Sequence, residues 1–216
     1  MKIIHLLCLV LCIAFVTPGH SAQTELKGMP LEWKPSETIS SYGTIDLAAY
    51  HNVQFVIKPF TDQRRQPAEI GNNTEKRFSG RDMLVTTNQS VAGWLTDKFA
   101  KVFTQFGIDV VADRGAFSVD AAVIKFFVTE SSVYDGDVSL KITLKSKDGL
   151  VAWEGVTTGS ASRFGRSFNA ENYYEALSNA TISAVHGLLN DDSFKLAVLK
   201  NNSITSPHST RQSSHP

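Results

Sequence analysis

Polar and apolar side chains alternate most regularly between residues 121 and 156. In residues 138–145, Val, Leu and Ile take every second position and Ser, Lys and Thr take the others, which is typical of an antiparallel strand with one buried face. Residues 121–128 are apolar on both faces and rich in β-branched and aromatic side chains, which favours a more central strand. Asp135-Gly136 and Lys147-Asp148-Gly149 supply turn residues, and residues 150–156 return as a third strand. The pattern therefore predicts a three-strand meander.

A further strand is predicted before this meander. Residues 53–60 are rich in apolar and β-branched side chains, and Pro59 ends the strand because proline has no backbone N–H to donate to a ladder. A sheet with one apolar face needs a cover, and two amphipathic segments have a suitable length for it. We therefore predict a single α+β domain over residues 51–200. Its mainly antiparallel sheet, made of the N-terminal strand and the meander, is covered on one face by two helices.

The two helices are marked by their periodicity and by their ends. Ser90 precedes a segment whose apolar side chains lie three and four positions apart, and Gly107 stands where such a helix stops. Asn169 precedes a second segment of this kind, which ends at Asn190-Asp191. We interpret the aromatic stripe of the first helix as core packing rather than as a ligand pocket. This stripe consists of Trp94, Phe99, Phe103 and Phe106.

Residues 62–88, between the first strand and the first helix, are rich in charged and amide side chains and poor in apolar ones. We interpret them as a long loop. Loops of this length in compact domains are commonly functional or mobile, so this segment is the first candidate for binding a partner, with a solvated loop as the alternative. The candidate binding residues in it are Asp62, Arg64, Arg65, Arg77 and Arg81.

Glycine and serine are frequent in residues 157–168, which also contain Arg163 and Arg166. Backbone N–H groups and guanidinium groups in such a loop can bind an anion. The spacing matches no phosphate-binding motif, because it has neither a Gly-Lys-Ser/Thr ending nor a Gly-x-Gly-x-x-Gly pattern. Two alternatives remain, an anion site that uses the two arginines and a flexible connection from sheet to helix.

The N-terminal end is typical of a secreted protein. A lysine and an apolar run up to Val16 predict a signal peptide over residues 1–22, cleaved between Gly19 and Ala22, with an uncleaved anchor as the alternative. Both cysteines, Cys8 and Cys12, lie in this run, so the exported chain is expected to have no disulfide and no thiol chemistry.

Beyond the signal peptide, residues 23–50 are polar and contain prolines, which indicates an extended N-terminal arm. Met29, Leu31 and Trp33 within it are expected either to pack on the domain itself or to add to a sheet edge. At the other end, one or two helical turns are expected at 193–200, followed by a disordered tail at 201–216, which has too little apolar surface to order.

Composition excludes several functions. The 21 Lys and Arg residues balance 21 Asp and Glu residues and are not clustered, so we expect no binding of nucleic acid. Of the six histidines, only His51 and His186 lie outside the predicted signal peptide and tail, and neither has a second ligand at metal-binding spacing. Nothing near them resembles a catalytic nucleophile motif. We therefore predict a non-catalytic protein without a cofactor or a metal site.

The order of the predicted elements is informative as well. A strand reaches Asp62-Gln63-Arg64-Arg65 and continues to Ile70-Gly71, and it is followed by a polar loop, a helix closing on Gly107, a meander and a last helix ending at Asp191. Over roughly residues 53–194 this order resembles the YajG-like family of bacterial envelope lipoproteins. The resemblance implies an α+β domain in the periplasm, commonly tethered to a membrane, with no known catalysis. The chain departs from the family because it lacks the lipid-attachment cysteine.

Together, these observations predict an exported, periplasmic accessory protein of the bacterial envelope that acts through contacts with an envelope protein partner. One alternative is an oligomeric structural subunit of an envelope assembly. Another is a binder of small molecules or anions that uses residues 157–168. Proximity to a membrane and homo-oligomerisation are both compatible with the sequence.

Overall fold

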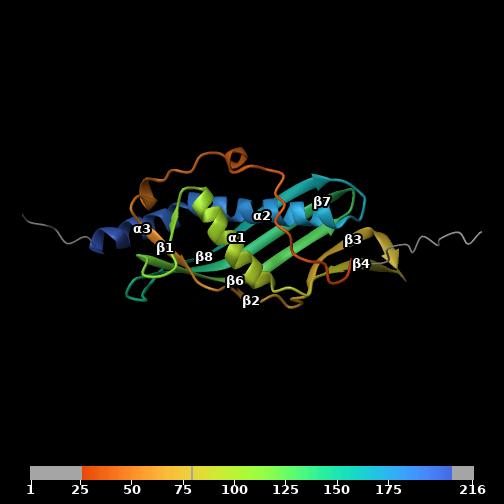
Figure 1. The fold of residues 1–216 in the computed structure, drawn as a ribbon, viewed down its shortest axis with the longest axis horizontal. Coiled ribbons are helices and arrows are strands. Elements are labelled where there is room, and N and C mark those ends of the chain that lie inside the picture. Colours follow the sequence, from red (N-terminus) through yellow and green to blue (C-terminus); the bar gives the residue numbers. More distant parts are fainter. Residues whose placement is uncertain (1–25, 79, 206–216) are drawn as a thin grey trace, which may run out of the picture.

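The computed structural model describes residues 26–78 and 80–205, without the side chains of residues 76–78 and 203–205. The predicted signal peptide and most of the predicted tail lie outside these residues. Two short 3₁₀ helices come first along the chain, and strands and α-helices follow (Figure 1). In order, the elements are η1 (Ile39–Tyr42), η2 (Ala48–Tyr50), β1 (Gln54–Ile57), β2 (Thr61–Asp62), β3 (Glu69–Phe78), β4 (Arg81–Thr86), α1 (Val91–Gln105), β5 (Asp109–Val110), β6 (Phe117–Glu130), β7 (Val133–Ser146), β8 (Val151–Phe164), α2 (Ala170–Asn190) and α3 (Asp192–Thr205).

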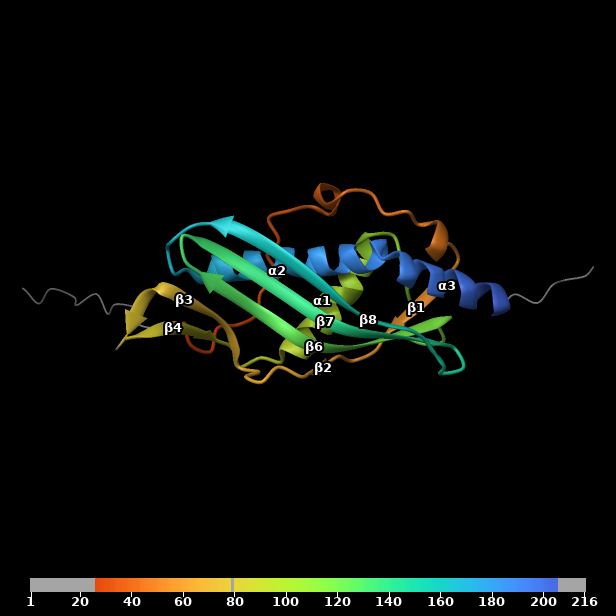
Figure 2. The same cartoon turned by 180° about the vertical axis from the view of Figure 1, so that it is seen from behind.

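The long strand β6 organises the sheet (Figure 2). β7 pairs with it antiparallel along its whole length, and β8 pairs with β7 in the same way, so these three strands form the predicted meander. Along its other edge, β6 pairs in succession with β1, β2 and β3, each parallel to it. β5 lies beside β1, and β4 lies beside β3. The predicted α+β fold with a mainly antiparallel sheet and helices on one face is confirmed.

The first turn of the meander is not where it was predicted. Asp135-Gly136 lies inside β7, and the chain reverses at Ser131, whose N–H donates a 2.8 Å hydrogen bond to the carbonyl oxygen of Val133. Glycine is needed at position 136 because α2 lies against β7 there, and a Cβ would come within 2.9 Å of the carbonyl oxygen of Ala176. The glycine that suggested a turn marks a close approach between a helix and a strand.

The predicted loop at 157–168 is wrong for most of its length. β8 continues to Phe164, and only residues 165–169 connect it to α2. A Cβ on Gly159 would lie 2.1 Å from both the carbonyl oxygen of Ala180 and the backbone nitrogen of Ala184, so α2 crosses β8 almost in backbone contact. The small residues of this segment therefore serve the packing of a helix on a strand, which sequence composition alone does not distinguish from a flexible loop.

Most of the predicted loop at 62–88 is a β-hairpin. β3 and β4 pair antiparallel, and residues 71–73 of β3 also pair with residues 128–130 of β6. The few apolar side chains of the hairpin are well used, since Ile70, Met83 and Val85 are buried. The loop prediction failed because neighbouring strands satisfy the backbone of this polar segment, and such non-local pairing leaves no periodic pattern in the segment itself.

Both predicted helices are confirmed, including their caps. α1 begins after Ser90, whose hydroxyl accepts a 3.1 Å hydrogen bond from the backbone N–H three residues later, and Gly107 adopts a φ of +89° at its end. α2 begins after Asn169, whose side chain accepts from the Glu171 N–H. α3 is longer than the predicted turns and continues to Thr205, so the first residues of the predicted tail are helical.

α1 and α2 lie on the same face of the sheet and enclose the core (Figure 1). Phe99 and Phe103 of α1 are completely buried, with stacked rings whose centroids are 4.6 Å apart. Phe55 of β1 contacts both Phe103 and Phe117 of β6, which joins the helix layer to the sheet. Large aromatic side chains contribute much of the apolar area that a core buries, so the interpretation of this stripe as core is confirmed.

The N-terminal segment, residues 26–50, lies across the helix layer (Figure 1). Leu26 forms a parallel bridge to Val85 of β4, and the Met29 N–H donates a 2.8 Å hydrogen bond to a carbonyl of the same strand. Leu31 is buried, and Trp33 packs against the core beside α1. The segment therefore covers the edge strand β4 and also packs on its own domain, which combines the two alternatives that the sequence left open.

Candidate functional site

Asp62 and Arg64 form a cross-link inside the sheet. The Gln63 N–H still donates to the Val123 carbonyl oxygen of β6, and residues 64–68 then form a bulge before β3 pairs with β6 again. The Arg64 side chain binds across this bulge. Its Nη1 donates to the carbonyl oxygens of Glu69 and Phe126, at 2.8 and 3.3 Å, and its Nε and Nη2 bind the Asp62 carboxylate at 3.0 and 2.7 Å. Only 7% of the Arg64 side chain is exposed. These donors hold the bulge in place.

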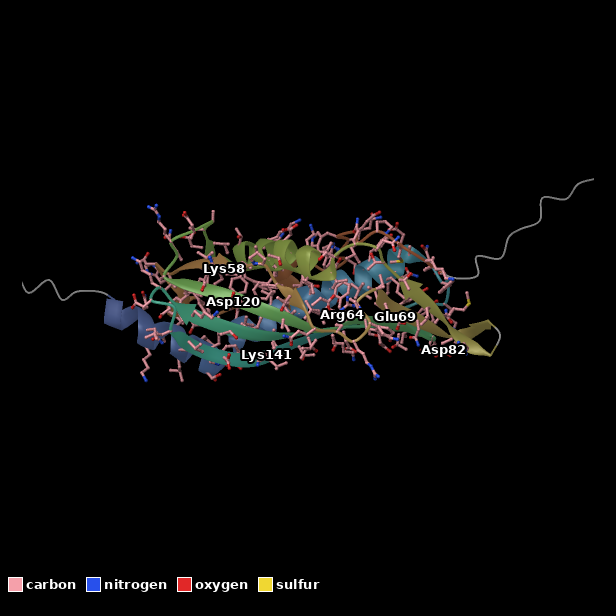
Figure 3. The ribbon with its side chains drawn as sticks, turned by 90° about the horizontal axis from the view of Figure 1, so that it is seen from below. Lys58, Arg64, Glu69, Asp82, Asp120 and Lys141 are labelled. Atoms are coloured by element: carbon pink, nitrogen blue, oxygen red, sulfur yellow. The ribbon has the colours of Figure 1, made fainter. Side chains whose placement is uncertain are left out.

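The other candidate arginines of this segment lie in different elements. Arg65 is exposed and lines a shallow hollow of about 220 Å³ next to β6. Arg81 is exposed at the start of β4, and Arg77 lies in β3 with its side chain outside the described part. Figure 3 shows the bulge near Arg64 and the hairpin near Asp82 at different places along the sheet. The register of the hairpin, which pairs Arg77 with Asp82 and Phe78 with Arg81, brings Arg77 and Arg81 close together, but Arg64 lies apart from them.

Arg163 and Arg166 each have an acidic partner within the protein. Arg163 of β8 donates to the side-chain oxygen of Asn172 and forms an ion pair with Glu175, and both partners belong to α2. Arg166, in the connection after β8, lies 3.5 Å from Glu75 of β3, and its side chain is 64% exposed. The two arginines are thus engaged by different elements, and an anion site that uses them stays a prediction.

A buried carboxylate, Glu130, lies beneath the start of α2. One of its oxygens accepts a 2.8 Å hydrogen bond from the Phe168 N–H, and the other accepts a 2.8 Å hydrogen bond from the Tyr173 hydroxyl. Burial, together with the Glu130 carboxylate, raises the pKa of Tyr173, so the phenol stays protonated and donates. The N-terminal end of α2 also favours a negative charge here. Sequence reasoning missed Glu130, since a single glutamate after a strand is usually exposed.

His186, the histidine of the last predicted helix, is half-buried between two aromatic rings. Its ring lies 6.0 Å from that of Tyr42 and 5.7 Å from that of Phe106, and burial lowers its pKa. Within residues 26–78 and 80–205, no three His, Cys, Asp or Glu residues are grouped in a way that could hold a metal ion. No helix in the same ranges has the length and the apolar character needed to cross a membrane.

β8 presents the longest unpaired edge among the strands described. It pairs with β7 alone, over 14 residues, and its register is unshifted from Trp153 to Phe164. Proteins commonly protect such an edge with Lys, Pro or a bulge, but β8 contains no Lys and no Pro, and its bulge lies only at its start, between Val151 and Trp153. Thr157 and Gly159 face α2, so Val156 points to the opposite, open face, where 60% of it is exposed. Phe164 is 84% exposed on the same strand.

The opposite edge of the sheet is protected differently. The chain's own residues 26–29 lie along β4, where the Thr86 N–H donates to the Leu26 carbonyl oxygen at 2.9 Å and the Met29 N–H donates back to the Thr86 carbonyl oxygen at 2.8 Å. In the part of the chain that the structure describes, the backbone of β8 has no hydrogen bond of this kind beyond its ladder with β7. The edge of β8 is therefore the best candidate for an interaction site.

Comparison with known proteins shows similarity of fold. No protein-family model matches the chain, and no curated protein matches it by sequence. Protein XCC0632 from Xanthomonas campestris, of the family DUF330, has a TM-score of 0.53 and 17% identity, over 75% of this chain and 94% of that protein. A PelC dodecamer from Paraburkholderia phytofirmans has a TM-score of 0.38 and 13% identity, over 63% and 86% of the two chains. A minor lipoprotein from Acinetobacter baumannii has a TM-score of 0.33 and 9% identity, over 68% and 94%.

At 17% identity, the likeness to the DUF330 protein shows a common fold and does not extend to function. The two weaker likenesses have TM-scores below 0.5 and support no argument about this chain. Membership in the YajG-like family stays a prediction.

Proposed function

We propose that this protein is a non-catalytic binding protein of the bacterial envelope that pairs the edge of β8 with an extended strand of a partner protein. The observation that supports this most directly is the open edge itself, 14 residues long and without Lys or Pro. Strand addition supplies affinity through main-chain hydrogen bonds and specificity through alternate side chains. On the open face, Val156 and Phe164 favour apolar side chains at the facing positions of the partner.

The N-terminal sequence supports a location of the protein outside the cytoplasm. The apolar run up to Val16 supports export through a signal peptide, and the resemblance to YajG-like lipoproteins supports the periplasm as the destination. The partner is then expected to be another envelope protein. The oligomeric alternative uses the same edge, with a second copy of this chain as the added strand.

Site-specific crosslinking in intact cells tests this proposal. A photoreactive amino acid is placed at the exposed Thr158 of β8 and, as a matched control, at Leu196, which is 65% exposed and belongs to helix α3 rather than to the strand. We expect a crosslink from position 158 to one other envelope protein, which is then identified and purified. A charge on the edge opposes strand pairing, so Val156→Lys should abolish the crosslink and weaken the purified complex about tenfold or more, whereas Leu196→Lys should not.

Two results would contradict this proposal. Crosslinks only between copies of the chain, with a mass in solution that shows a stable oligomer, would favour the oligomeric subunit. Equal crosslinking from positions 158 and 196, or none from position 158, would show that the edge of β8 is not an interaction site.

A further inference from the structure

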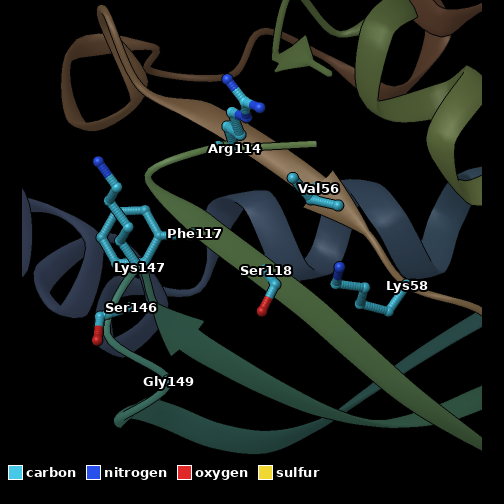
Figure 4. Close-up of a pocket in the computed structure, with 9 residues that line it drawn as sticks. Val56, Lys58, Arg114, Phe117, Ser118, Ser146, Lys147 and Gly149 are labelled. Atoms are coloured by element: carbon cyan, nitrogen blue, oxygen red, sulfur yellow. The ribbon is translucent and has the colours of Figure 1, made fainter. Parts of the chain in front are cut away.

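A basic hollow of about 390 Å³ lies at the end of β6 away from the hairpin β3–β4 (Figure 4). Three separate segments form it, which are the end of β1, the turn before β6 and the turn between β7 and β8. We propose that this hollow binds the phosphate group of an anionic ligand. The residues that support this proposal are Lys58, Arg114, Gly115, Ser118, Ser146 and Lys147.

The charge of the hollow is positive and is not neutralised by its own walls. Lys58, Arg114 and Lys147 line it, and no Asp or Glu residue does. Among the described residues, neither lysine forms an ion pair. Arg114 lies 4.0 Å from Asp113, but both side chains are more than 80% exposed, so water screens this pair strongly. In a chain with equal numbers of acidic and basic residues, such a local excess favours an anion.

The turn that carries Arg114 is held firmly against β1. A Cβ on Gly115 would lie only 2.8 Å from the carbonyl oxygen of Gln54, so the turn packs there as closely as its backbone permits. Arg114 itself adopts a φ of +55°, a left-handed conformation that costs a residue with a Cβ about 1–2 kcal/mol. This backbone conformation places the Arg114 guanidinium at the rim of the hollow, across from Lys147 (Figure 4).

A hydroxyl group completes the set of donors. Ser118 lies on β6 between Lys58 and Lys147 in the view of Figure 4. The hydroxyl of Ser146, at the start of the β7–β8 turn, donates to the Leu150 carbonyl oxygen at 3.3 Å and so holds the turn that carries Lys147. Ammonium, guanidinium and hydroxyl donors from several directions match the three acceptor oxygens of a phosphate monoester better than the planar pair of a carboxylate.

The volume of the hollow leaves room for a ligand larger than inorganic phosphate, since sites of about 300–1,000 Å³ hold small organic molecules. Leu150, at the end of the β7–β8 turn, and Val151, the first residue of β8, are 70% and 57% exposed. An apolar rim beside a basic hollow suits the headgroup of an anionic phospholipid as well as a soluble phosphate ester. Both ligands present the same phosphate chemistry, and an experiment can separate them.

An NMR titration of the isotope-labelled protein with sn-glycerol 3-phosphate tests the site. A titration with glycerol at the same ionic strength is the blank. We expect the backbone amide signals of Gly115, Ser118 and Gly149 to shift in a saturable manner. The double variant Lys58→Gln/Lys147→Gln should weaken binding about tenfold or more, since each such cation near an anionic surface contributes about 1 kcal/mol. The matched variant Lys98→Gln/Lys141→Gln removes the same charge elsewhere and should bind like the wild type.

Sedimentation with vesicles of phosphatidylglycerol, and with vesicles of phosphatidylcholine as the blank, separates the two sources of phosphate. Binding to the anionic vesicles that is lost in Lys58→Gln/Lys147→Gln and in Leu150→Ser assigns a lipid headgroup. Binding of the soluble ester alone assigns a soluble phosphate ester. The proposal is overturned if neither probe binds, or if the two lysine pairs affect binding equally. All exchanged cations are on the surface, so the variants are expected to fold.

Discussion

The hydroxyl of Tyr173 on α2 donates a 2.8 Å hydrogen bond to the carboxylate of Glu130 at the end of β6. Both side chains are fully buried, and the second carboxylate oxygen accepts from the Phe168 N–H just before α2 begins. The carboxylate therefore joins the end of the central strand β6 to the start of the longest helix, α2. The buried carboxylate is tolerated here because each of its oxygens accepts a hydrogen bond and because the N-terminal end of α2 carries a partial positive charge.

Replacement of Glu130 by Ala should destabilise the protein by about 2–4 kcal/mol, because it removes the acceptor of the buried Phe168 N–H and leaves the Tyr173 hydroxyl with only the longer contact, 3.4 Å, to the Asn72 carbonyl oxygen. Tyr173→Phe should cost less, about 1–3 kcal/mol. Chemical denaturation measures both values. A double variant whose loss is smaller than the sum of the two single losses would demonstrate the coupling, and strict additivity would disprove it.

Arg64→Ala should cost about 2–4 kcal/mol of stability, because the Asp62 carboxylate and the carbonyl oxygens of Glu69 and Phe126 lose the guanidinium that donates to them. Arg64→Lys should recover only part of this, since an ammonium cannot reach several acceptors as the guanidinium fork does. The exposed neighbour Arg65 is the control, and Arg65→Ala should change stability by less than about 0.5 kcal/mol. Thermal unfolding measures all three, and equal effects at positions 64 and 65 would refute the structural role of Arg64.

Gly159→Ala should prevent normal docking of α2, because the added Cβ would lie 2.1 Å from backbone atoms of Ala180 and Ala184. Gly187→Ala is a matched change within α2, where the nearest atom to the new Cβ is a side-chain oxygen at 3.6 Å. Since alanine favours the helix, it should stabilise the protein by about 0.5–1 kcal/mol. Circular dichroism during thermal unfolding compares the two variants, and a Gly159→Ala protein as stable as the wild type would contradict the close contact.

His186 should make the protein less stable as the pH is lowered below neutrality. Burial lowers the pKa of this side chain below its ordinary value of 6.5, so the unfolded chain takes up a proton at a higher pH than the folded one. The stabilisation is complete above pH 6.5 and is lost as the pH falls from 6.5 toward the folded pKa. His186→Gln should flatten the pH dependence of the denaturation midpoint in this range, and an unchanged pH dependence in this variant would contradict the role of His186.

Features with a local cause were predictable from the sequence. Ser90, Gly107 and Asn169 mark the ends of helices through contacts with residues only a few positions away, and these contacts are present in the structure. The alternation in residues 138–145 likewise reflects one buried and one open face of a single strand. Each of these signals is complete within one segment, so no knowledge of the rest of the chain was needed.

Other signals had a non-local cause and were misleading. Gly136 and Gly159 suggested a turn and a loop, but both occupy strands where α2 leaves no room for a Cβ. The polar hairpin β3–β4 depends on hydrogen bonds to β6, and the segment itself carries little trace of that pairing. The cations of the basic hollow, Lys58, Arg114 and Lys147, are far apart in the sequence and meet only because three segments end beside one another.

By itself, the sequence determined the fold class, the positions of the main helices and most of the meander, because alternation, helical spacing and capping depend on neighbouring residues. Only the tertiary structure decided which strand edge stays open, which groups Arg64 and Glu130 bind inside the protein, and which basic residues lie together. Those properties depend on which distant segments pack against one another, and backbone pairing and packing between such segments leave little periodic trace in either segment alone.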